Sequence, residues 1–334
     1  MRFTRTSEQQ DMAEAVGDLL GRGHLPALAR DWAQGDVASW WALWQKLASM
    51  GVTGVAIPES HGGLGTGPVE LAACLEELGY AGMPGPVVET LAAIPKLVQH
   101  TGVAEPVLSR VGSGEAIATV AFTDHGGLAL DADRSDYRYL CVGDAAYRAT
   151  PDSDGQPSFD PARRMFALRR RDEALEGADA DAAFLHGAFG CAAQLLGIGR
   201  RLLDLSLHHV RQRHQFGRPI GEFQAVKHHL ADVRIALDFA RPVVNGAALA
   251  LRDATGQAAR DVSAAKIVTA DAAHRAARVA LQVHGAIGYT VEHDLHLWST
   301  KATTLRSAWG TPSWHRHRVA EALATSSELP IGGA

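Results

Sequence analysis

A short segment near the end of the chain, LRSAWGTPSW at residues 305–314, has the pattern of a turn that positions one side chain. The residues before it have helical character, the Gly-Thr pair interrupts them, and Pro312 suits the first turn of a new helix. A junction of this kind can hold a catalytic acid or base, but the side chain at its centre is the indole of Trp309. Because an indole only donates a hydrogen bond, Trp309 either packs in the core or stands where a catalytic residue is missing.

Two longer stretches combine a cation, aromatic rings, amides and glycines at close spacing. They read RQRHQFGRPIGEFQAVKHHLADV at residues 211–233 and LQVHGAIGYTVEHDLHLW at residues 281–298. A guanidinium pairs with phosphate oxygens, and glycine lets a ligand approach the backbone closely. Both stretches are therefore candidates for ligand contact, although the glycine after LQVH also suits a plain helix end.

Other familiar chemical motifs are absent from the sequence. No GxGxxG follows an expected strand, and neither GxxxxGK(S/T) nor GxSxG occurs, which argues against a Rossmann dinucleotide fold, a P-loop and a hydrolase nucleophile elbow. The glycine-rich GGLGTG at residues 62–67 is interpreted as a loop. The histidine-rich EHDLH and HRH lack the HExxH order and a nearby third ligand, so we expect no metal site.

Composition narrows the class of protein. The 334 residues are 46% hydrophobic, enough for a substantial core, and the net charge of -5 offers no basic surface for nucleic acid or an anionic membrane. Cys74, Cys141 and Cys191 are too scattered for a disulfide framework and favour a reducing cytosol. The N-terminus lacks the apolar core of a signal peptide, and no run of about 18 apolar residues occurs. We therefore expect a cytoplasmic globular protein whose partners are small molecules or other proteins.

The elements that must position the candidate residues lie in three parts of the sequence, each with its own pattern of apolar and turn-forming residues. In the first third, Ser7 and Gln10 have capping-box spacing for a helix over residues 8–20, and Pro68 suits the start of another. Residues 114–183 contain short apolar runs that predict strands, with residues 149–164 expected as a loop or a poorly ordered link. The chain is helical again after residue 183, and Pro242 is expected to kink or divide one long helix. The sequence thus predicts a mainly α protein with a small β-domain.

These motifs resemble the acyl-CoA dehydrogenase family. Residues 211–233 match its Arg-x-x-Phe-Gly-x-x-(Ile/Leu)-x-x-x-Gln element, and residues 281–298 match its Gln-x-x-Gly-(Gly/Ala)-x-Gly-(Tyr/Phe) element. Residues 51–80 resemble the helical first domain of the same family, and the likeness is weakest in the middle of the chain. The resemblance implies an N-terminal helical domain over residues 1–113, a truncated middle β-domain over 114–183, and a C-terminal four-helix bundle over 184–334 that binds flavin and forms the oligomer.

The resemblance also implies FAD as cofactor, an acyl-CoA as substrate and electron-transfer flavoprotein as electron acceptor. It assigns Arg213 to the pyrophosphate, Phe216 and Gln224 to the adenosine side, and Gln282 with Gly285 to a loop under the diphosphate. In the family these elements reach across a dimer interface into the neighbouring subunit's flavin site. Further candidate cofactor contacts are Phe122 and Thr123, which survive from the family's Thr-Glu-Pro element, and Thr311 in the C-terminal turn.

The departures from the family pattern concern the catalytic base. α,β-Dehydrogenation removes an α-proton to a glutamate that lies either in a C-terminal Glu-Gly-Thr turn or on an upstream helix; ungapped counting places these positions at Trp309 and Gly187. Neither is a carboxylate, so no catalytic residue is assigned. The same counting places Leu185 and Ala188 where many relatives carry an Asp and an Arg that hold the acyl-CoA.

Three hypotheses follow. In the first, the chain is a base-lacking subunit of a heteromeric (α2β2) acyl-CoA dehydrogenase, similar to actinobacterial enzymes of which some act on steroid side chains, and contributes FAD contacts to a homologous partner. In the second, it is a self-sufficient homo-oligomer with a displaced base, Asp181 or Glu292. In the third, the fold serves as a flavoprotein oxidase or as a structural subunit. We expect Trp309 to fill or cap the vestigial acyl pocket.

Overall fold

The computed structural model describes residues 5–21, 23 and 25–326 of the chain, and helices dominate it. The helices before the sheet are α1 (Ser7–Gly21), α2 (Leu25–Gln34), α3 (Ala38–Ser49), α4 (Pro68–Ala81), α5 (Ile94–Val98) and α6 (Ala104–Gly112). Those after it are α7 (Ala180–Gln212), α8 (Gln224–Arg252), α9 (Ala258–His284), α10 (Leu295–Ser307) and α11 (Pro312–Ser326). A π-helical turn, η3 (Glu89–Ala93), leads into α5, and 3-10 turns η1 (Val52–Gly54), η2 (Glu59–His61), η4 (Thr123–His125), η5 (Ile220–Glu222) and η6 (Gly285–Tyr289) connect other elements.

The strands between α6 and α7 form one sheet with the order β1-β3-β4-β6-β2, and β5 pairs with the free part of β6. Their bounds are β1 (Ala118–Phe122), β2 (Leu128–Leu130), β3 (Tyr137–Val142), β4 (Ala145–Pro151), β5 (Gln156–Pro157) and β6 (Arg164–Ala174). β1 and β3 run parallel, and the other pairs are antiparallel. Because side chains alternate along a strand, Val120 and Tyr139 face the helices while Ala121 and Leu140 pack with Phe166 on the other face.

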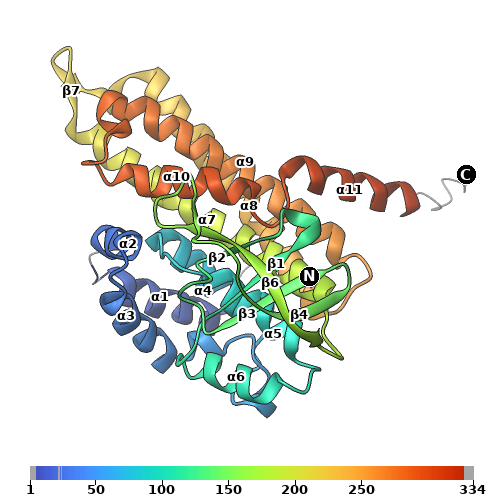
Figure 1. Cartoon of the computed structure of the whole chain (residues 1–334). Helices are drawn as coiled ribbons and strands as arrows, with labels where there is room; N and C mark the ends of the chain where they lie inside the picture. Colours follow the sequence, from blue (N-terminus) through green and yellow to red (C-terminus); the bar gives the residue numbers. More distant parts are fainter. Residues whose placement is uncertain (1–4, 22, 24, 327–334) are drawn as a thin grey trace, which may run out of the picture.

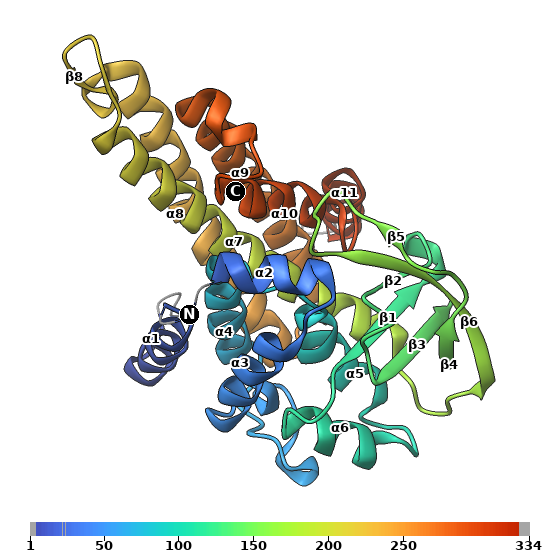
Figure 2. The same cartoon turned by 60° about the vertical axis from the view of Figure 1, so that its left-hand side comes forward.

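Figures 1 and 2 show the sheet beside a bundle in which α7, α8, α9 and α10 run along one another. A small hairpin of β7 (His214–Gln215) and β8 (Arg218–Pro219) stands at the end of the bundle remote from the sheet (Figure 1). The predicted fold class is confirmed: helices come first, a small sheet follows, and a helical bundle ends the described chain. The spacing of apolar residues made this prediction possible. Helices α7 to α9 bury long apolar stripes, which show in the sequence as helical periodicity, whereas the strands are short apolar runs.

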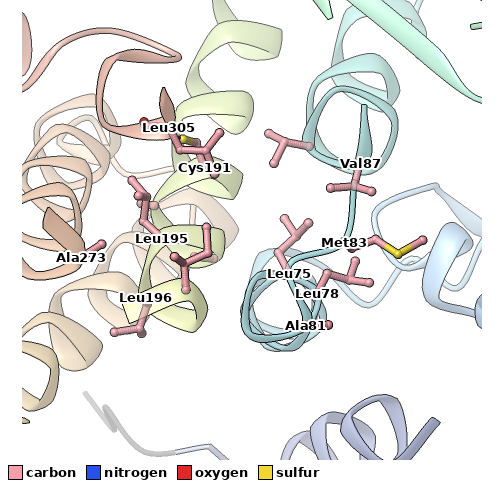
Figure 3. Close-up of a cluster of buried hydrophobic side chains, with 14 of the residues drawn as sticks. Leu75, Leu78, Ala81, Met83, Val87, Cys191, Leu195, Leu196, Ala273 and Leu305 are labelled. Carbon is pink, nitrogen blue, oxygen red and sulfur yellow. Dashed lines mark hydrogen bonds between the residues drawn. The ribbon is translucent and has the colours of Figure 1, made fainter. Parts of the chain in front are cut away.

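The core that positions the site lies between α4, α7 and the segment that joins α4 to η3 (Figure 3). Close packing here depends on glycine, because a Cβ on Gly79 would overlap the backbone of Gln194 and a Cβ on Gly197 would overlap the backbone of Glu76. The two helices therefore approach with their backbones nearly in contact. This fixes the start of α7, with Phe184 and Gly187, relative to the η3 turn that carries Glu89.

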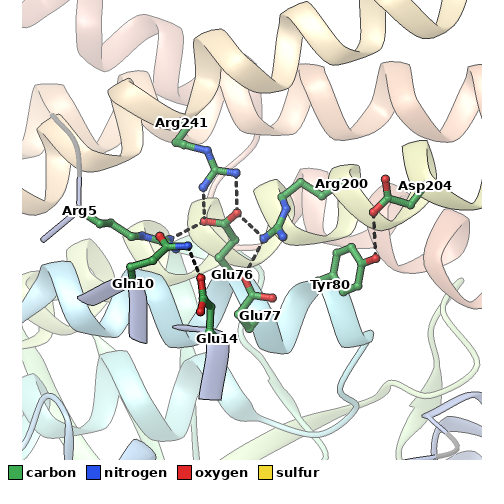
Figure 4. A network of polar contacts seen from close by, with 9 residues as sticks. All are labelled: Arg5, Gln10, Glu14, Glu76, Glu77, Tyr80, Arg200, Asp204 and Arg241. Carbon is green, nitrogen blue, oxygen red and sulfur yellow. Dashed lines mark hydrogen bonds and ion pairs between the residues drawn. The ribbon is translucent and has the colours of Figure 1, made fainter. Parts of the chain in front are cut away.

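A buried ion-pair network ties the same helices together (Figure 4). The carboxylate of Glu76 on α4 lies 2.6–2.9 Å from the guanidiniums of Arg5, Arg200 and Arg241. Burial alone would raise the pKa of Glu76, but the three arginines lower it below its ordinary value. Since one carboxylate joins the N-terminal segment, α7 and α8, the network holds the N-terminal helices on the bundle.

The first helix begins close to the predicted place but is capped differently. The reciprocal bonds of the capping box are made by Thr6 and Gln9, where the Thr6 N–H donates to Gln9 Oε1 at 2.9 Å and the Gln9 N–H donates to Thr6 Oγ1 at 3.4 Å. The predicted pair, Ser7 and Gln10, is wrong by one residue because both pairs have the same spacing. Gln10 instead bonds Glu14 along the helix.

Two further expectations need correction. Of the two outcomes expected at Pro242, a kink or a division of the helix, the division does not occur, because α8 continues through Pro242 from Gln224 to Arg252 while the packed face around Val244 and Ala240 stays buried. Residues 149–164 are not a loose link: they include the end of β4 and all of β5, and Asp160 is buried in an ion pair with Lys301 at 2.9 Å. The many turn-forming residues of this segment predicted a loop, and nothing in the sequence indicated the ion pair between Asp160 and Lys301.

Among the described helices, α7 is long and apolar enough to cross a membrane by length and composition. The apolar window of α7 is 83% buried inside the protein. Its hydrophobicity is therefore that of a central core helix, surrounded by α4, α8, α9 and α10.

Candidate functional site

The turn between α10 and α11 holds Trp309 in an unusual backbone conformation, with φ at +57°. Lys266 on α9 is fully buried and its ammonium donates to the carbonyls of Leu305 and Arg306 at 3.1 Å and of Gly310 at 3.4 Å. Left-handed backbone is uncommon for a bulky residue and persists where the surroundings impose it. The carbonyl contacts of Lys266 are one such constraint.

His315 on α11 completes the support of this turn. Its Nε2 lies 2.9 Å from the Trp309 carbonyl and its Nδ1 lies 3.1 Å from Ser263 Oγ. Because a carbonyl only accepts, Nε2 carries the proton and Nδ1 accepts from the hydroxyl of Ser263. Burial lowers the pKa of His315 to about 4, which keeps this imidazole neutral.

The indole of Trp309 lies directly on Gly187 of α7. A Cβ on Gly187 would overlap the six-membered ring of Trp309, so the absence of a side chain at Gly187 makes room for the indole. The two positions that sequence counting singled out for a base are thus neighbours in the structure. Neither presents an acid or a base there.

Rings from three parts of the chain close around Trp309. Phe122 at the end of β1 lies 5.6 Å from Trp309 between ring centroids, and Phe184 of α7 lies 5.8 Å from it. His125 stacks on Phe184 at 3.9 Å, and Trp314 of α11 touches both at 5.0 and 5.5 Å. Since aromatic pairs at these separations attract one another, these rings pack as one group, which we call the aromatic plug.

A buried carboxyl that no motif indicated lies beneath the plug. Glu89 is the first residue of the π-helical turn η3, is 6% exposed, and lies close to the side chain of Trp309. Burial raises the pKa of Glu89, although Arg163 and the neighbouring indole of Trp309 oppose the rise. A π-turn inside a helix often marks a functional site, but a single-sequence reading has no pattern that reveals one.

Two cavities adjoin the plug. The smaller, of about 190 Å³, is lined by Glu89, Arg163 and Trp309 together with apolar side chains. The larger cleft, of about 510 Å³, includes Leu185 and is rimmed by four aspartates, which are Asp124, Asp144, Asp179 and Asp181. Ala188 lines neither cavity, because it is buried in the core. The cleft therefore presents mostly negative charge to any ligand.

The predicted adenosine-side residues gather at the far end of the bundle. Arg213 follows the last residue of α7, and Gly285 follows the last residue of α9. These two helix ends lie side by side, as the stacked rings of His209 and His284 show, with centroids 4.1 Å apart. Gly285 has φ of +63° and open space where a Cβ would stand. Within the part of the chain that the structure describes, no hydrogen bond or ion pair engages the Arg213 guanidinium.

Phe216 stands at the tip of the hairpin at the same end. Its side chain is 91% exposed and its backbone is left-handed, with φ of +53°. Gln224 and Gln282 are exposed as well. A free guanidinium, an exposed ring, two amides and an open glycine fit the adenosine diphosphate part of a dinucleotide such as FAD, held at a surface rather than in a pocket of this chain.

The other predicted cofactor residues lie near the plug. Thr123 is exposed and its hydroxyl donates to Asp124 at 3.2 Å, while Thr311 accepts from the N–H of Trp314 at 3.2 Å as the cap of α11. Figures 1 and 2 place the sheet and the hairpin at opposite sides of the bundle, so one chain does not bring the two sets together. The cavity of about 190 Å³ also falls below the ~300–1,000 Å³ of most ligand pockets, and an isoalloxazine does not fit there.

The two displaced-base candidates are separated by the structure. Asp181 lies in the first turn of α7 on the rim of the larger cleft. Glu292 is exposed just before α10, whereas Trp309 follows the other end of that 13-residue helix, about 20 Å away along its axis. Glu292 is therefore not near the plug, and a base at Glu292 would have to act at another place. In the described ranges, no group of three His, Cys, Asp or Glu side chains could hold a metal ion.

Comparison with known proteins gives consistent matches over most of the chain. Residues 6–116 match the family model "Acyl-CoA dehydrogenase, N-terminal domain", and residues 177–324 match "Acyl-CoA dehydrogenase, C-terminal domain". The chain is 31% identical over 316 residues to "Acyl-CoA dehydrogenase IpdE2" of Mycobacterium tuberculosis, covering 90% of this chain and 92% of that protein.

Solved structures share the fold. The "ChsE4-ChsE5 complex from Mycobacterium tuberculosis" superposes with a TM-score of 0.84 at 24% identity, covering 99% of this chain and 100% of the matched chain. A variant of the "Tcur3481-Tcur3483 steroid ACAD" superposes with a TM-score of 0.82 at 22% identity, covering 96% and 98%. At these identities the likeness extends to the fold alone.

Proposed function

Because the chain belongs to the acyl-CoA dehydrogenase family, whose members depend on FAD, we propose that it is the base-lacking subunit of a heteromeric acyl-CoA dehydrogenase. In this role it lends adenosine-side contacts to a flavin held mainly by a homologous partner. The partner supplies the carboxylate that removes the substrate's α-proton. FAD, when bound, would supply the acceptor for the β-hydride, and electron-transfer flavoprotein would be the electron acceptor of the assembled enzyme.

The observation that carries the proposal is the contact between Trp309 and Gly187. Both positions expected to hold a base belong to one packed unit, and the indole occupies the space between them. Removing a general base costs roughly 10²–10⁴ in rate. In this chain, an aromatic side chain that packs against its neighbours occupies the place where a base would remove a proton.

The surroundings of the plug support the same conclusion. Acyl-CoA carries several phosphate charges, and the larger cleft meets them with Asp124, Asp144, Asp179 and Asp181 against one cation, Arg318. Like charges at a cleft mouth lower the local concentration of an anionic substrate. Leu185, at a position where an acidic residue was expected to hold the substrate, adds no polar group to this cleft.

The opposite end of the bundle supports the assignment as a donor of cofactor contacts. Arg213, Phe216 and Gly285 are exposed there. An exposed ring in a left-handed backbone conformation is costly unless something is gained by holding it. A cofactor bound in a neighbouring subunit would cover these residues and use the guanidinium for its pyrophosphate.

We further propose a bulky acyl-CoA, such as one with a steroid side chain, as the substrate of the assembled enzyme. The solved relatives include a complex of two named chains and a steroid acyl-CoA dehydrogenase. The substrate pocket would be formed by the partner, since the plug fills the corresponding space in this chain.

The test is to purify the chain alone and together with a co-expressed homologue that carries a complete Thr-Glu-Pro element and a catalytic glutamate. The chain alone is expected to lack flavin absorbance and acyl-CoA turnover. The co-purified complex is expected to be yellow and active. Dehydrogenation of acyl-CoA by the isolated chain, at rates typical of an enzyme, would overturn the proposal.

A self-sufficient enzyme remains the second candidate, favoured by the position of Asp181 on the rim of the larger cleft. If the isolated chain were active, Asp181→Asn would distinguish the two cases. Loss of that activity would assign the base to Asp181, and unchanged activity would exclude it.

A further inference from the structure

The smaller cavity beneath Trp309 is open at one side and closed at the other by buried charge. Exposed lining residues at one side are Gly126, Leu128 and Ser307. The buried lining includes Arg163 and Glu89, 7% and 6% exposed, with Val120, Leu130 and Phe184 beside them. The cavity thus leads from the surface to a guanidinium and a carboxyl within an apolar wall.

Arg163 is the unusual feature of this cavity. Its Nε atom is buried without a hydrogen-bond partner, and within the described residues no carboxylate lies within 4.0 Å of its guanidinium. Other buried cations of this chain are engaged: Lys266 bonds three carbonyls and Lys301 pairs with Asp160. A buried arginine is rarely left without a partner because desolvating its charge is costly.

The charged groups that the structure describes near Arg163 do not form an ion pair with it. The nearby charged groups are Arg134, Asp131 and Glu89, which interact with one another or with Arg163 through their charges. Asp131 is buried and accepts bonds from the Trp32 indole at 3.2 Å and the Arg164 N–H at 3.0 Å. Burial raises the pKa of Glu89 and so shifts this carboxyl toward its uncharged form, in which it does not offset the charge of Arg163. One monovalent anion beside Arg163 would offset that charge.

We propose that this cavity binds a short-chain carboxylate, with the carboxylate on Arg163, the Glu89 carboxyl donating to it when protonated, and the alkyl tail against Phe122, Phe184 and Met165. A volume of about 190 Å³ corresponds to about six water molecules at ~30 Å³ each. This is room for an acid of about four or five carbons and not for a thioester of coenzyme A. The site is separate from the distal cofactor edge and does not depend on the function proposed above.

Glu89 acts in this site as an internal competitor. When its carboxyl ionises, Glu89 itself balances the charge of Arg163, and an incoming carboxylate meets a like charge. The pKa of Glu89 is raised by burial and that of Asp131 is raised to about 6, so both become neutral on the acid side and favour anion binding there. His125, which also lines the cavity and whose pKa burial lowers, gains charge in the same direction. Binding should therefore weaken as pH rises.

The experiment is calorimetric titration of the full chain with butyrate, and with butyramide as a neutral probe of the same shape. Butyrate is expected to bind and butyramide to bind at least about 10-fold more weakly, since a hydrogen bond to a charged group contributes ~1.5–3 kcal/mol. Arg163→Met should weaken butyrate binding about 10- to 100-fold by the same reasoning. Arg169→Met, on the exposed part of β6, is the matched control and should bind like the unaltered chain.

Glu89→Gln keeps the test decisive if Arg163→Met fails to fold. Above neutral pH this variant should bind butyrate more tightly than the unaltered chain, because the competing carboxylate is gone. Absence of butyrate binding by the folded, unaltered chain would mean that water alone fills the cavity. Equal binding of butyramide, or weaker binding by Glu89→Gln, would also overturn the proposal.

Discussion

The indole of Trp309 rests on the backbone of Gly187, so closely that any side chain at Gly187 would overlap it. The residues come from the α10–α11 turn and from the first turns of α7. Their contact joins the C-terminal segment to the central helix. It also explains why a glycine is tolerated in a helix where alanine would be better by ~1 kcal/mol.

Gly187→Ala should destabilise the chain by about 1–3 kcal/mol, the usual cost of adding a methyl group to a packed core. In a Trp309→Ala background the same change should be stabilising, because the space is free and alanine favours the helix. Urea unfolding of the four proteins of this double-mutant cycle measures the difference. An equal effect of Gly187→Ala in both backgrounds would show that the two residues are not in contact.

Trp309→Glu alone should not create acyl-CoA dehydrogenase activity in the isolated chain. The new carboxylate would lie beside the buried Glu89, and the acidic cleft and Leu185 would still disfavour acyl-CoA. Turnover is measured with an artificial electron acceptor, and thermal unfolding verifies that the variant is folded. An increase of ~10² or more, the scale of a working general base, would mean that the pocket is far less altered than proposed.

Arg213→Ala and Phe216→Gly should leave the folded chain nearly unchanged, within ~0.5 kcal/mol in unfolding free energy, because both side chains are exposed. In the co-purified complex they should lower the retained FAD, measured as the ratio of flavin to protein absorbance. Loss of a charge-assisted phosphate contact corresponds to about 10-fold weaker binding or more. Arg171→Ala, an exposed arginine of the sheet, is the matched control. If all three variants retain FAD equally, the distal edge does not contact the cofactor.

Stability should fall as pH decreases from about 6.5 to about 4, partly through His315. The folded state holds this imidazole neutral, so its stabilising effect is complete above the unfolded pKa of 6.5 and is lost as pH approaches the folded value. The shift corresponds to about 3 kcal/mol.

His315→Gln keeps a donor for the Trp309 carbonyl and removes the titration. The difference in unfolding free energy between the unaltered chain and this variant should therefore shrink on acidification, as followed by urea titrations at several pH values. His317→Gln, at an exposed position of the same helix, is the control. A difference that stays constant with pH would contradict the neutral, buried state of His315.

Local signals in the sequence predicted much of the helical framework. Pro68 begins α4 as expected, and the change near residue 114 from helical periodicity to short apolar runs comes just before β1. Counting along two motifs also singled out Trp309 and Gly187 as the two positions where a base was expected, and the structure brings these residues into contact. Such predictions succeed where the information lies within a few turns of chain or within one motif.

The charged cavity could not be predicted in the same way. Glu89, Asp131 and Arg163 come from η3, from the segment after β2 and from the segment before β6, and only the packing of the sheet against η3 assembles them. Arg163 even lies in the stretch that resembled a loose link. No spacing rule connects residues that meet through long-range contacts, and the π-turn at Glu89 has no sequence signature.

The support of the turn by Lys266 and His315 has an evolutionary consequence. Both bind backbone carbonyls, and neither hydrogen-bonds the side chain at Trp309. The backbone conformation of the junction therefore does not depend on hydrogen bonds to the side chain at Trp309. Replacement of the indole of Trp309 by another side chain during evolution would thus not require a new fold of the junction.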